Sequence, residues 1–480
     1  MSVQEGDLRQ EVREEAPVRA ARPFSAVAGV LTRAMGVRGT SLLLALVLLM
    51  STTLVAGPWP GPSRVPLPGQ EGAPGQTVSR VVAGARSWPA WMAARGEAPV
   101  WAGGPRPSST SSASLVAGYR GWPPAPPAAL LAGSTGPAAE ADPTGSEVRG
   151  IYLTGYTAGN PVRFQELLGL VDRTALNAMV INIKPETGRA TYDTRVQAFR
   201  EAGAVAVQIE DIEALLRVTE AYGIYTIGRL VVFNDSTLPR YNPDLAVKTR
   251  DGRLWRDHAG NYWSDPFRPE VWEYNIALAE EAARLGFDEI QFDYVRFPTD
   301  GDMEDCVFSR PSGPDNANRI RAITEFLRCA RDRLAAYGVP ISADVFGIIC
   351  STRVDTSLGQ VLEEIAQVVD YISPMIYPSH YGPGHFGLPD PDAEPYLTVY
   401  GALEDALERL GPDAAGRLRP WLQDFTLRNH YGPEEVLDQI RATHKLGIKG
   451  WLLWNPANRY SVAALRAYTV NQEAYLAGTD

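Results

Sequence analysis

The sequence predicts a (β/α)8 barrel that follows an apolar anchor segment and a long spacer, and three observations predict it. From residue 148 onward, short runs of β-branched residues alternate with amphipathic stretches, which is the pattern of βαβ units around a parallel sheet. The alternation repeats eight times, and roughly 330 residues are enough for a barrel with insertions. Glycines follow the predicted helices and prolines begin several of them.

The eight repeats predict an α/β fold of the TIM-barrel type, element by element. The expected strands cover residues 150–154, 178–184, 225–233, 289–294, 340–346, 371–377, 418–423 and 449–454. The expected helices cover residues 161–175, 209–222, 269–285, 318–337, 358–367, 396–410 and 433–446, and the last begins near 461. An open, doubly wound sheet is the alternative. Because no phosphate-binding G-x-G-x-x-G follows the first strand and the units are regular, a closed barrel is favoured.

Two segments begin the chain, ahead of the linker and the predicted barrel. Residues 1–39 form a polar, arginine-containing segment that we expect in the cytoplasm, and residues 40–57 form an uncharged apolar run just long enough to span a bilayer. Arginines ahead of such a run favour translocation of the downstream chain, so we expect a single-pass signal anchor at the cell membrane and an extracytoplasmic barrel. A cleaved signal peptide, which would give a secreted protein, and a buried core helix are the alternatives.

Residues 58–147 are rich in Pro, Gly, Ala and Ser, and we expect a disordered linker there. Residues 148–480 then hold the predicted barrel. A net charge of -11 argues against a nucleic acid partner, because proteins that bind phosphate backbones usually present a basic face.

The cysteines and histidines predict neither a metal site nor a cofactor. No C-x-x-C pair occurs, and the five histidines lack the spacing of metal ligands. Cys306 and Cys350 fall in successive loops of the predicted barrel, so one disulfide and three free thiols are both open.

Two aspartates carry the functional prediction. In this type of barrel the active site lies at the carboxyl ends of the strands. Because strand side chains alternate, Gln291 and Asp293 of the fourth strand should face the axis, and Ser342 and Asp344 of the fifth should do the same. Two acids at the tops of adjacent strands are the arrangement for carboxylate-pair glycoside hydrolysis, in which one group attacks or stabilises and the other donates a proton. Capping of the next loop is the structural alternative for each.

Further polar and aromatic residues should surround this pair. We expect Lys184 and Glu186 at the rim, and Arg229 inside its strand paired with a carboxylate. Of Gln423 and Asp424 only one can face inward, and Trp454 is either the floor of a sugar subsite or a core residue. The candidate substrate-binding residues are Lys184, Glu186, Arg229, Trp263, Gln291, Arg296, Tyr377, His380, Gln423, Asp424, Trp454 and Asn455.

The loop of residues 234–265 contains several aromatic residues around two turn signals, Asp251-Gly252 and Gly260-Asn261. This pattern predicts a β-hairpin insert over the mouth of the barrel. Its Trp255, Tyr262 and Trp263 either line a groove for an extended polymer or form a small buried cluster under the loop.

The region from about residue 148 to residue 468 resembles a bacterial family of glycoside hydrolases of unassigned activity. The stretches that carry the resemblance are GFDEIQFDYVRFP, ISADVFG, DYISPMIYPSHY, RPWLQDF and GWLLWNP. The resemblance implies a hydrolase-type barrel and a polysaccharide substrate of unspecified kind.

Two other families resemble parts of the sequence. FDEIQFD, SPMIY and Trp454 are similar to the fourth, sixth and eighth strands of family 18 chitinases, but the chitinase acid would fall at Val295, which argues against substrate-assisted chemistry. By position, Asp293, Asp344 and Asp424 resemble the nucleophile, the acid/base and the assisting aspartate of the α-amylase superfamily.

The sequence therefore predicts an enzyme that cleaves glycosidic bonds of an extracellular or cell-envelope polysaccharide, with Asp293 and Asp344 as the catalytic pair. A non-catalytic carbohydrate-binding barrel at the cell wall is one alternative. A metal-dependent deacetylase is another, and the scarcity of histidines near strand ends, His380 and His385 alone, argues against it.

Overall fold

The computed structural model of the 480-residue chain describes residues 147–310, 313–472 and 475. The predicted cytoplasmic segment 1–39, anchor 40–57 and linker 58–147 therefore lie outside the described residues, apart from residue 147. Among the helices that are described, none has the length and apolar character needed to cross a bilayer.

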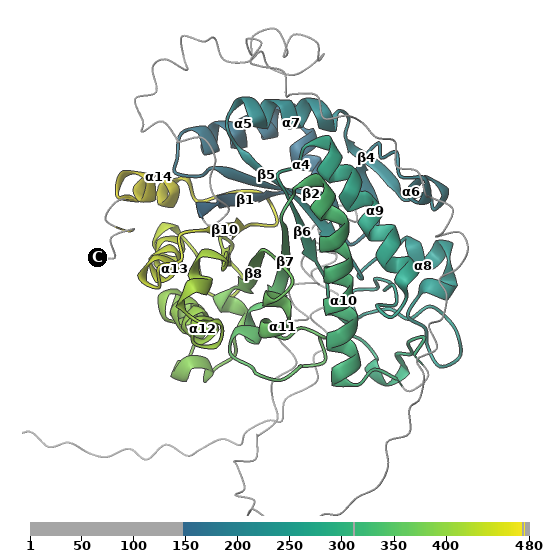
Figure 1. Ribbon diagram of the computed structural model, residues 1–480. Coiled ribbons are helices and arrows are strands. Elements are labelled where there is room, and N and C mark those ends of the chain that lie inside the picture. Colours follow the sequence, from purple (N-terminus) through teal and green to yellow (C-terminus); the bar gives the residue numbers. More distant parts are fainter. Residues whose placement is uncertain (1–146, 311–312, 473–474, 476–480) are drawn as a thin grey trace, which may run out of the picture. The chain divides into compact units, whose positions relative to one another are not determined.

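Eight parallel strands close into a barrel, as predicted (Figure 1). They are β1 (Arg149–Leu153), β2 (Ala178–Lys184), β5 (Tyr225–Val231), β6 (Glu289–Asp293), β7 (Ile341–Phe346), β8 (Tyr371–Ile376), β9 (Trp421–Gln423) and β10 (Trp451–Trp454). The barrel closes where β1 pairs with β10, with Gly150 opposite Leu452. Because all eight strands run the same way, their carboxyl ends share one face of the barrel.

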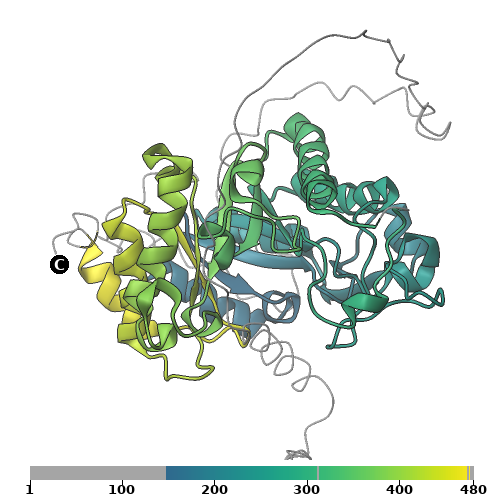
Figure 2. The same ribbon diagram turned by 90° about the horizontal axis from the view of Figure 1, so that it is seen from below.

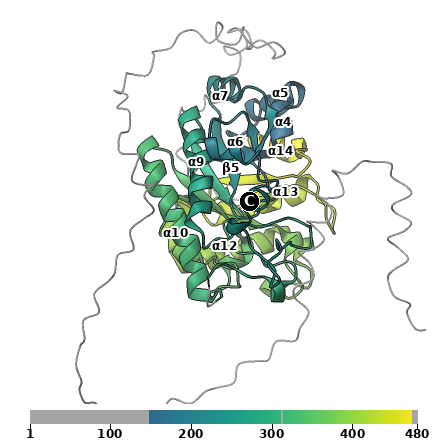
Figure 3. The same cartoon turned by 90° about the vertical axis from the view of Figure 1, so that its right-hand side faces the viewer.

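The eight main helices surround the strands on the outside. They are α5 (Pro161–Asp172), α7 (Ile212–Ala221), α9 (Pro269–Leu285), α10 (Asn316–Leu334), α11 (Leu362–Ala366), α12 (Pro395–Leu410), α13 (Pro433–Lys445) and α14 (Val462–Val470). Asn160 caps α5 by accepting from the N–H groups of Val162 and Arg163, and Gly286 ends α9 in the left-handed region with φ of 106°. Helices α9 and α10 lie side by side (Figures 1 and 3).

Additional elements occupy the loops at the carboxyl ends of the strands. The loop after β1 contains α4 (Gly155–Gly159), and the loop after β2 contains the two-stranded parallel sheet of β3 (Ala190–Tyr192) and β4 (Val205–Ile209), with α6 (Gln197–Glu201) between them. The loop after β5 contains α8 (Leu238–Tyr241). Figure 2 shows this teal segment on the opposite side of the barrel from the yellow-green helices near the C-terminus.

Two predicted elements are shorter in the structure. The helix expected at 358–367 covers only Leu362–Ala366, because the side chain of Gln360 accepts from the N–H of Phe346 and donates to the carbonyl of Asp344. The strand expected at 418–423 begins at Trp421, directly after Pro420, which has no N–H to donate. The three cysteines are free thiols.

Candidate active site

The tops of β6 and β7 place the two predicted aspartates together. In these neighbouring strands Gln291 lies opposite Ser342 and Phe292 opposite Ala343. Phe292 faces outward, with its ring 5.3 Å from that of Phe326 on α10. Alternation then turns Asp293 inward, where 5 % of it is exposed, and Asp344 inward, where 1 % is exposed.

Arg229 of β5 joins the carboxylates of the site. Its Nε lies 3.0 Å from Asp293 Oδ2 and 3.9 Å from Asp344 Oδ2. Its Nη2 also forms an ion pair with Asp293 and lies 3.2 Å from Glu186 Oε1. The predictions that Arg229 is paired with a carboxylate and that Glu186 lies at the rim are confirmed, since the Glu186 side chain is 36 % exposed. The buried guanidinium of Arg229 therefore contacts three carboxyl groups that lie at or just beyond the ends of three strands.

Aromatic rings lie beside the Arg229 cluster of acids. Trp454 stacks on Tyr152 with a centroid distance of 4.1 Å and meets Trp421 edge-on at 5.4 Å. The guanidinium carbon of Arg229 lies 5.3 Å from the Trp454 ring centre. Trp454 is partly exposed, so it is not sealed in the core. An aromatic face beside carboxylates suits the apolar face of a sugar ring.

Trp421 and Tyr152 are site residues that we did not predict from the sequence. The indole Nε1 of Trp421 donates to Asp344 Oδ1 at 2.7 Å, and the Tyr152 hydroxyl accepts from Asn182 Nδ2 at 2.9 Å. The same alternation that turned Asp293 inward provides a signal, because Trp421 shares its inward parity with Gln423.

The surroundings of Asp344 change the pKa of its carboxyl group. Burial raises the pKa of Asp344 well above its usual range, and the neighbouring Asp293 charge raises it further. Arg229 and the Trp421 N–H act in the opposite direction. Burial and the same two acids also raise the pKa of the Tyr377 hydroxyl. Burial and the neighbouring acid therefore favour the protonated form of Asp344, while the close partner of Asp293 is a guanidinium.

The backbone turns sharply beyond Asp293. Tyr294 has φ of 49°, which is unusual for a residue with a bulky side chain, and its N–H donates to Asp293 Oδ1 at 2.6 Å. Such strain is maintained only when the surrounding structure holds it, and it clusters at functional sites. The turn aims Asp293 inward and places Arg296 among aromatic rings at the mouth.

Three other candidate residues can be placed by their contacts. Gln291 lies one step below Asp293 and donates to Ser373 Oγ at 3.2 Å. Tyr377 and the partly exposed His380 pack together with ring centroids 5.3 Å apart, and burial lowers the pKa of His380 to about 4. His380 is therefore neutral at physiological pH and serves as a polar wall rather than a cation.

Lys184 does not lie at the rim, and that prediction is wrong. Its side chain is fully buried in an ion pair with Asp235 at 2.8 Å, and it donates to the carbonyl of Val231 at 2.7 Å. The cause is a register shift in β2, because Asn182 pairs with Arg229 but Lys184 pairs with the next residue, Leu230. The contacts with Val231 and Asp235 hold the Lys184 side chain against the end of β5 and the loop that follows it.

The structure resolves the question of Gln423 and Asp424. Gln423 shares the inward parity of Trp421 and accepts from the N–H of Ser379 at 3.1 Å. Asp424 accepts from the N–H of Ser461 at 2.8 Å, and Asn455 donates to the Asp424 carbonyl. Asp424 and Asn455 thus stabilise the loop after β10, and neither of these contacts joins Asp424 to the Arg229 cluster.

The insert after β5 buries its aromatic rings. Trp255 and Trp263 are each 2 % exposed and Tyr262 is 7 % exposed, so the predicted polymer groove is wrong and the small buried cluster is confirmed. Antiparallel bridges such as Arg256 with Tyr262 give hairpin-like turns without continuous strands. His258 is exposed and contacts Asp300.

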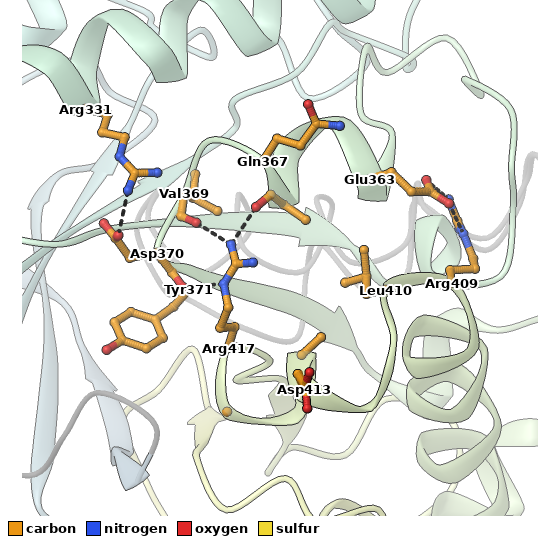
Figure 4. Close-up of a pocket in the computed structure, with 13 residues that line it drawn as sticks. Arg331, Glu363, Gln367, Val369, Asp370, Tyr371, Arg409, Leu410, Asp413 and Arg417 are labelled. Carbon is orange, nitrogen blue, oxygen red and sulfur yellow. Dashed lines mark hydrogen bonds and ion pairs between the residues drawn. The ribbon is translucent and has the colours of Figure 1, made fainter.

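A hollow of about 900 Å³ lies at the opposite end of the barrel (Figure 4). Its lining includes Asp370 and Tyr371, where β8 begins, so it opens away from the carboxyl ends of the strands. Arg417 donates there to the carbonyls of Ala366 and Val369, and Arg331 forms an ion pair with Asp370. These cations contact the end of α11 and the segment between it and β8, whereas Arg229 contacts the proposed catalytic acids. Among the residues in the structure, no group of three His, Cys, Asp or Glu side chains has the arrangement of a metal site.

Comparisons with known proteins identify a family and a shared fold. Residues 150–460 match the model of a family described as "Putative glycosyl hydrolase domain". No curated protein matches the chain. A hypothetical protein from Ruminiclostridium thermocellum is 40% identical over 41% of this chain and 97% of its own, with a TM-score of 0.37. The glycoside hydrolase domain of PgaB (BpsB) from Bordetella bronchiseptica is 15% identical over 67% of this chain and 98% of its own, with a TM-score of 0.52, which shows a shared fold.

Proposed function

The chain belongs to the glycosyl hydrolase family that its residues 150–460 match, and from this premise we propose that it cleaves glycosidic bonds of an extracellular or cell-envelope polysaccharide. We propose Asp293 and Asp344 as the catalytic pair. The observation that carries the proposal is the contact of one guanidinium, Arg229, with both carboxyl groups at the mouth of the barrel.

We assign the two roles from the surroundings of each aspartate. Asp293 forms an ion pair with Arg229 and is the nucleophile or charge stabiliser. Asp344, whose pKa is raised by burial and by Asp293, keeps its proton and donates it to the glycosidic oxygen. The leaving sugar then departs as an alcohol.

The spacing of the pair favours retention of configuration. Two oxygens 3.0 and 3.9 Å from one nitrogen lie at most about 7 Å apart, which reaches only the lower end of the ~6.5–9.5 Å range of inverting enzymes. In the retaining reaction Asp293 attacks the anomeric carbon as Asp344 protonates the leaving oxygen. Asp344 then removes a proton from water, and that water displaces Asp293 from the anomeric carbon. Proton NMR of the first anomer released tests this, and an inverted product would contradict it.

Isosteric neutralisation of each acid tests the assignment. We expect D293N and D344N each to lower turnover by at least ~10²-fold, the usual scale of acid–base contributions. The measurement is reducing-end release from envelope polysaccharides by the full-length protein. E186Q is the matched control, because Glu186 contacts the same guanidinium but lies at the rim, and we expect a smaller loss.

The pattern of losses separates the possible outcomes. If D344N kept its activity while E186Q lost it, Glu186 would be the proton donor and the assignment of Asp344 would be wrong. If the wild type bound glycans without hydrolysing any, and D293N and D344N bound them equally well, the barrel would be a non-catalytic carbohydrate-binding module.

We also propose that the apolar run of residues 40–57 anchors the barrel to the outer face of the cell membrane. Support comes from the arginines that precede it and the absence of charge within it. Cell fractionation with protease accessibility of the barrel is the test. A soluble product that begins after the run would show cleavage and secretion instead.

A further inference from the structure

Arg296 lies at the mouth of the barrel within a box of three aromatic rings. Its guanidinium carbon is 4.6 Å from the ring centre of Phe346, 4.9 Å from that of Tyr294 and 5.0 Å from that of Trp263. Tyr294 follows Asp293 directly, and Phe346 is two residues beyond Asp344, so the box lies beside the two aspartates. Arg296, Tyr294 and Phe346 are each partly exposed, which leaves the box open on one side.

The guanidinium in this box forms no ion pair within the described part of the chain. Its Nη1 donates to the carbonyl of Phe297 at 2.9 Å, which uses one of five N–H donors. Buried arginines elsewhere in the barrel have carboxylate partners, as Arg229 has with Asp293 and Arg419 has with Glu289. Arg296 is thus a fixed cation with free donors.

Three carboxylates raise the pKa of Arg296, but their close contacts are with other groups. Burial lowers the pKa of Arg296, and Tyr294, Asp293, Asp257 and Asp300 act in the opposite direction. The close partners of these acids are Arg229 for Asp293, the Trp263 N–H for Asp257 and His258 for Asp300. The charge of Arg296 therefore remains available to a ligand.

We infer that Arg296, with Tyr294 and Phe346, forms a subsite for an acidic sugar, in which the guanidinium binds the carboxylate of a uronic acid unit next to the cleavage point. The planar fork of arginine matches a carboxylate in a bidentate manner, and stacking on the rings holds the fork in place before the ligand arrives. The rings also offer an apolar surface to the sugar. This inference rests on the proposed function and specifies the class of glycan that the site accepts.

Calorimetric titration of the full-length protein tests the inference with oligosaccharides of glucuronate and galacturonate, each compared with its methyl ester. Esterification removes the charge and keeps the ring. We expect at least one acid to bind about 10-fold more tightly than its ester, because charge-assisted hydrogen bonds are stronger than neutral ones. We expect this preference to weaken as salt is raised, since the subsite is partly exposed.

Substitutions assign the preference to Arg296. R296Q should reduce it to within ~2-fold, and R296K, which keeps the charge but loses the fork, should give an intermediate value. R240Q is the matched control, because Arg240 is an exposed arginine that stacks on the Tyr262 ring of the same insert. It should leave the preference unchanged.

Several outcomes would overturn the inference. They are equal binding of acids and esters, no binding of either, or an unchanged preference in R296Q or R296K. Because R296K and the wild-type comparison do not depend on R296Q, misfolding of that variant leaves the test intact. The proposed function fails separately, because the acid preference is measured by binding and needs no turnover, whereas hydrolysis without acid preference rejects only the subsite.

Discussion

Replacement of Trp421 with phenylalanine should change the proton affinity of Asp344 without removing either of the proposed catalytic carboxylates. The indole Nε1 donates to Asp344 Oδ1 at 2.7 Å, and this bond lowers the pKa of Asp344 because it stabilises the ionised form. Phenylalanine keeps an aromatic ring near Trp454 and removes the donor. In W421F the pKa of Asp344, already raised by burial, should therefore rise further.

The size of the change follows from the strength of the lost bond. A hydrogen bond to a charged group contributes about 1.5–3 kcal/mol, and one pKa unit corresponds to about 1.4 kcal/mol. We therefore expect the pKa of Asp344 to rise by about one to two units. The smaller ring also leaves a gap, which should cost ~1–3 kcal/mol of unfolding free energy.

The pH dependence of kcat/KM measures the shift, because its alkaline limb reports the free enzyme's proton donor. In W421F that limb should move to higher pH by about one to two units. W454F is the matched control, because Trp454 lies in the same group of rings while the bond to Asp344 comes from Trp421, so kcat/KM should fall without a shift of the limb. A limb that stays in place or moves to lower pH in W421F would refute the assignment of Asp344 as proton donor.

Two further predictions concern stability. Burial raises the pKa of Asp424 from 3.8 to about 6, so the folded protein binds this proton more tightly than the unfolded chain and loses stability as pH rises between those values. D424N should then be about 3 kcal/mol more stable at pH 7 in urea unfolding, with little gain at pH 4, and no gain at pH 7 would count against the buried charge. K184M should lower the free energy of unfolding by about 3–5 kcal/mol, because it leaves Asp235 charged and fully buried without its partner. An unchanged melting temperature would show that the pair is not ionised.

Simple alternation along strands was enough to predict the centre of the site. It placed Asp293 and Asp344 correctly because β6 and β7 are regular and each has one face against helices. The expectation that Lys184 lies at the rim was wrong. The register shifts between Asn182 and Lys184, and a bulge has no reliable mark in a single sequence.

The remaining differences arise from contacts between distant segments. Nothing local in RPWLQDF indicates that Trp421 donates to an acid on β7, because the two residues are 77 positions apart. The aromatic residues of the insert are as compatible with an exposed groove as with a buried cluster, and only the packing of Trp255 and Trp263 decides between them.

The proton on Asp344 links the activity of the site to the stability of the fold. Its pKa is raised in the folded protein, so stability decreases as pH rises from the ordinary range of aspartate, near 4, toward that raised value. Over the same range the proposed proton donor would be lost, since Asp344 would become charged beside Asp293 with only Arg229 to balance both. D344N keeps the shape and cannot ionise, so at neutral pH it should be inactive yet at least as stable as the wild type. An aspartate present only to cap or pair would give the opposite result, a loss of stability with activity largely preserved, and that result would reject the catalytic role.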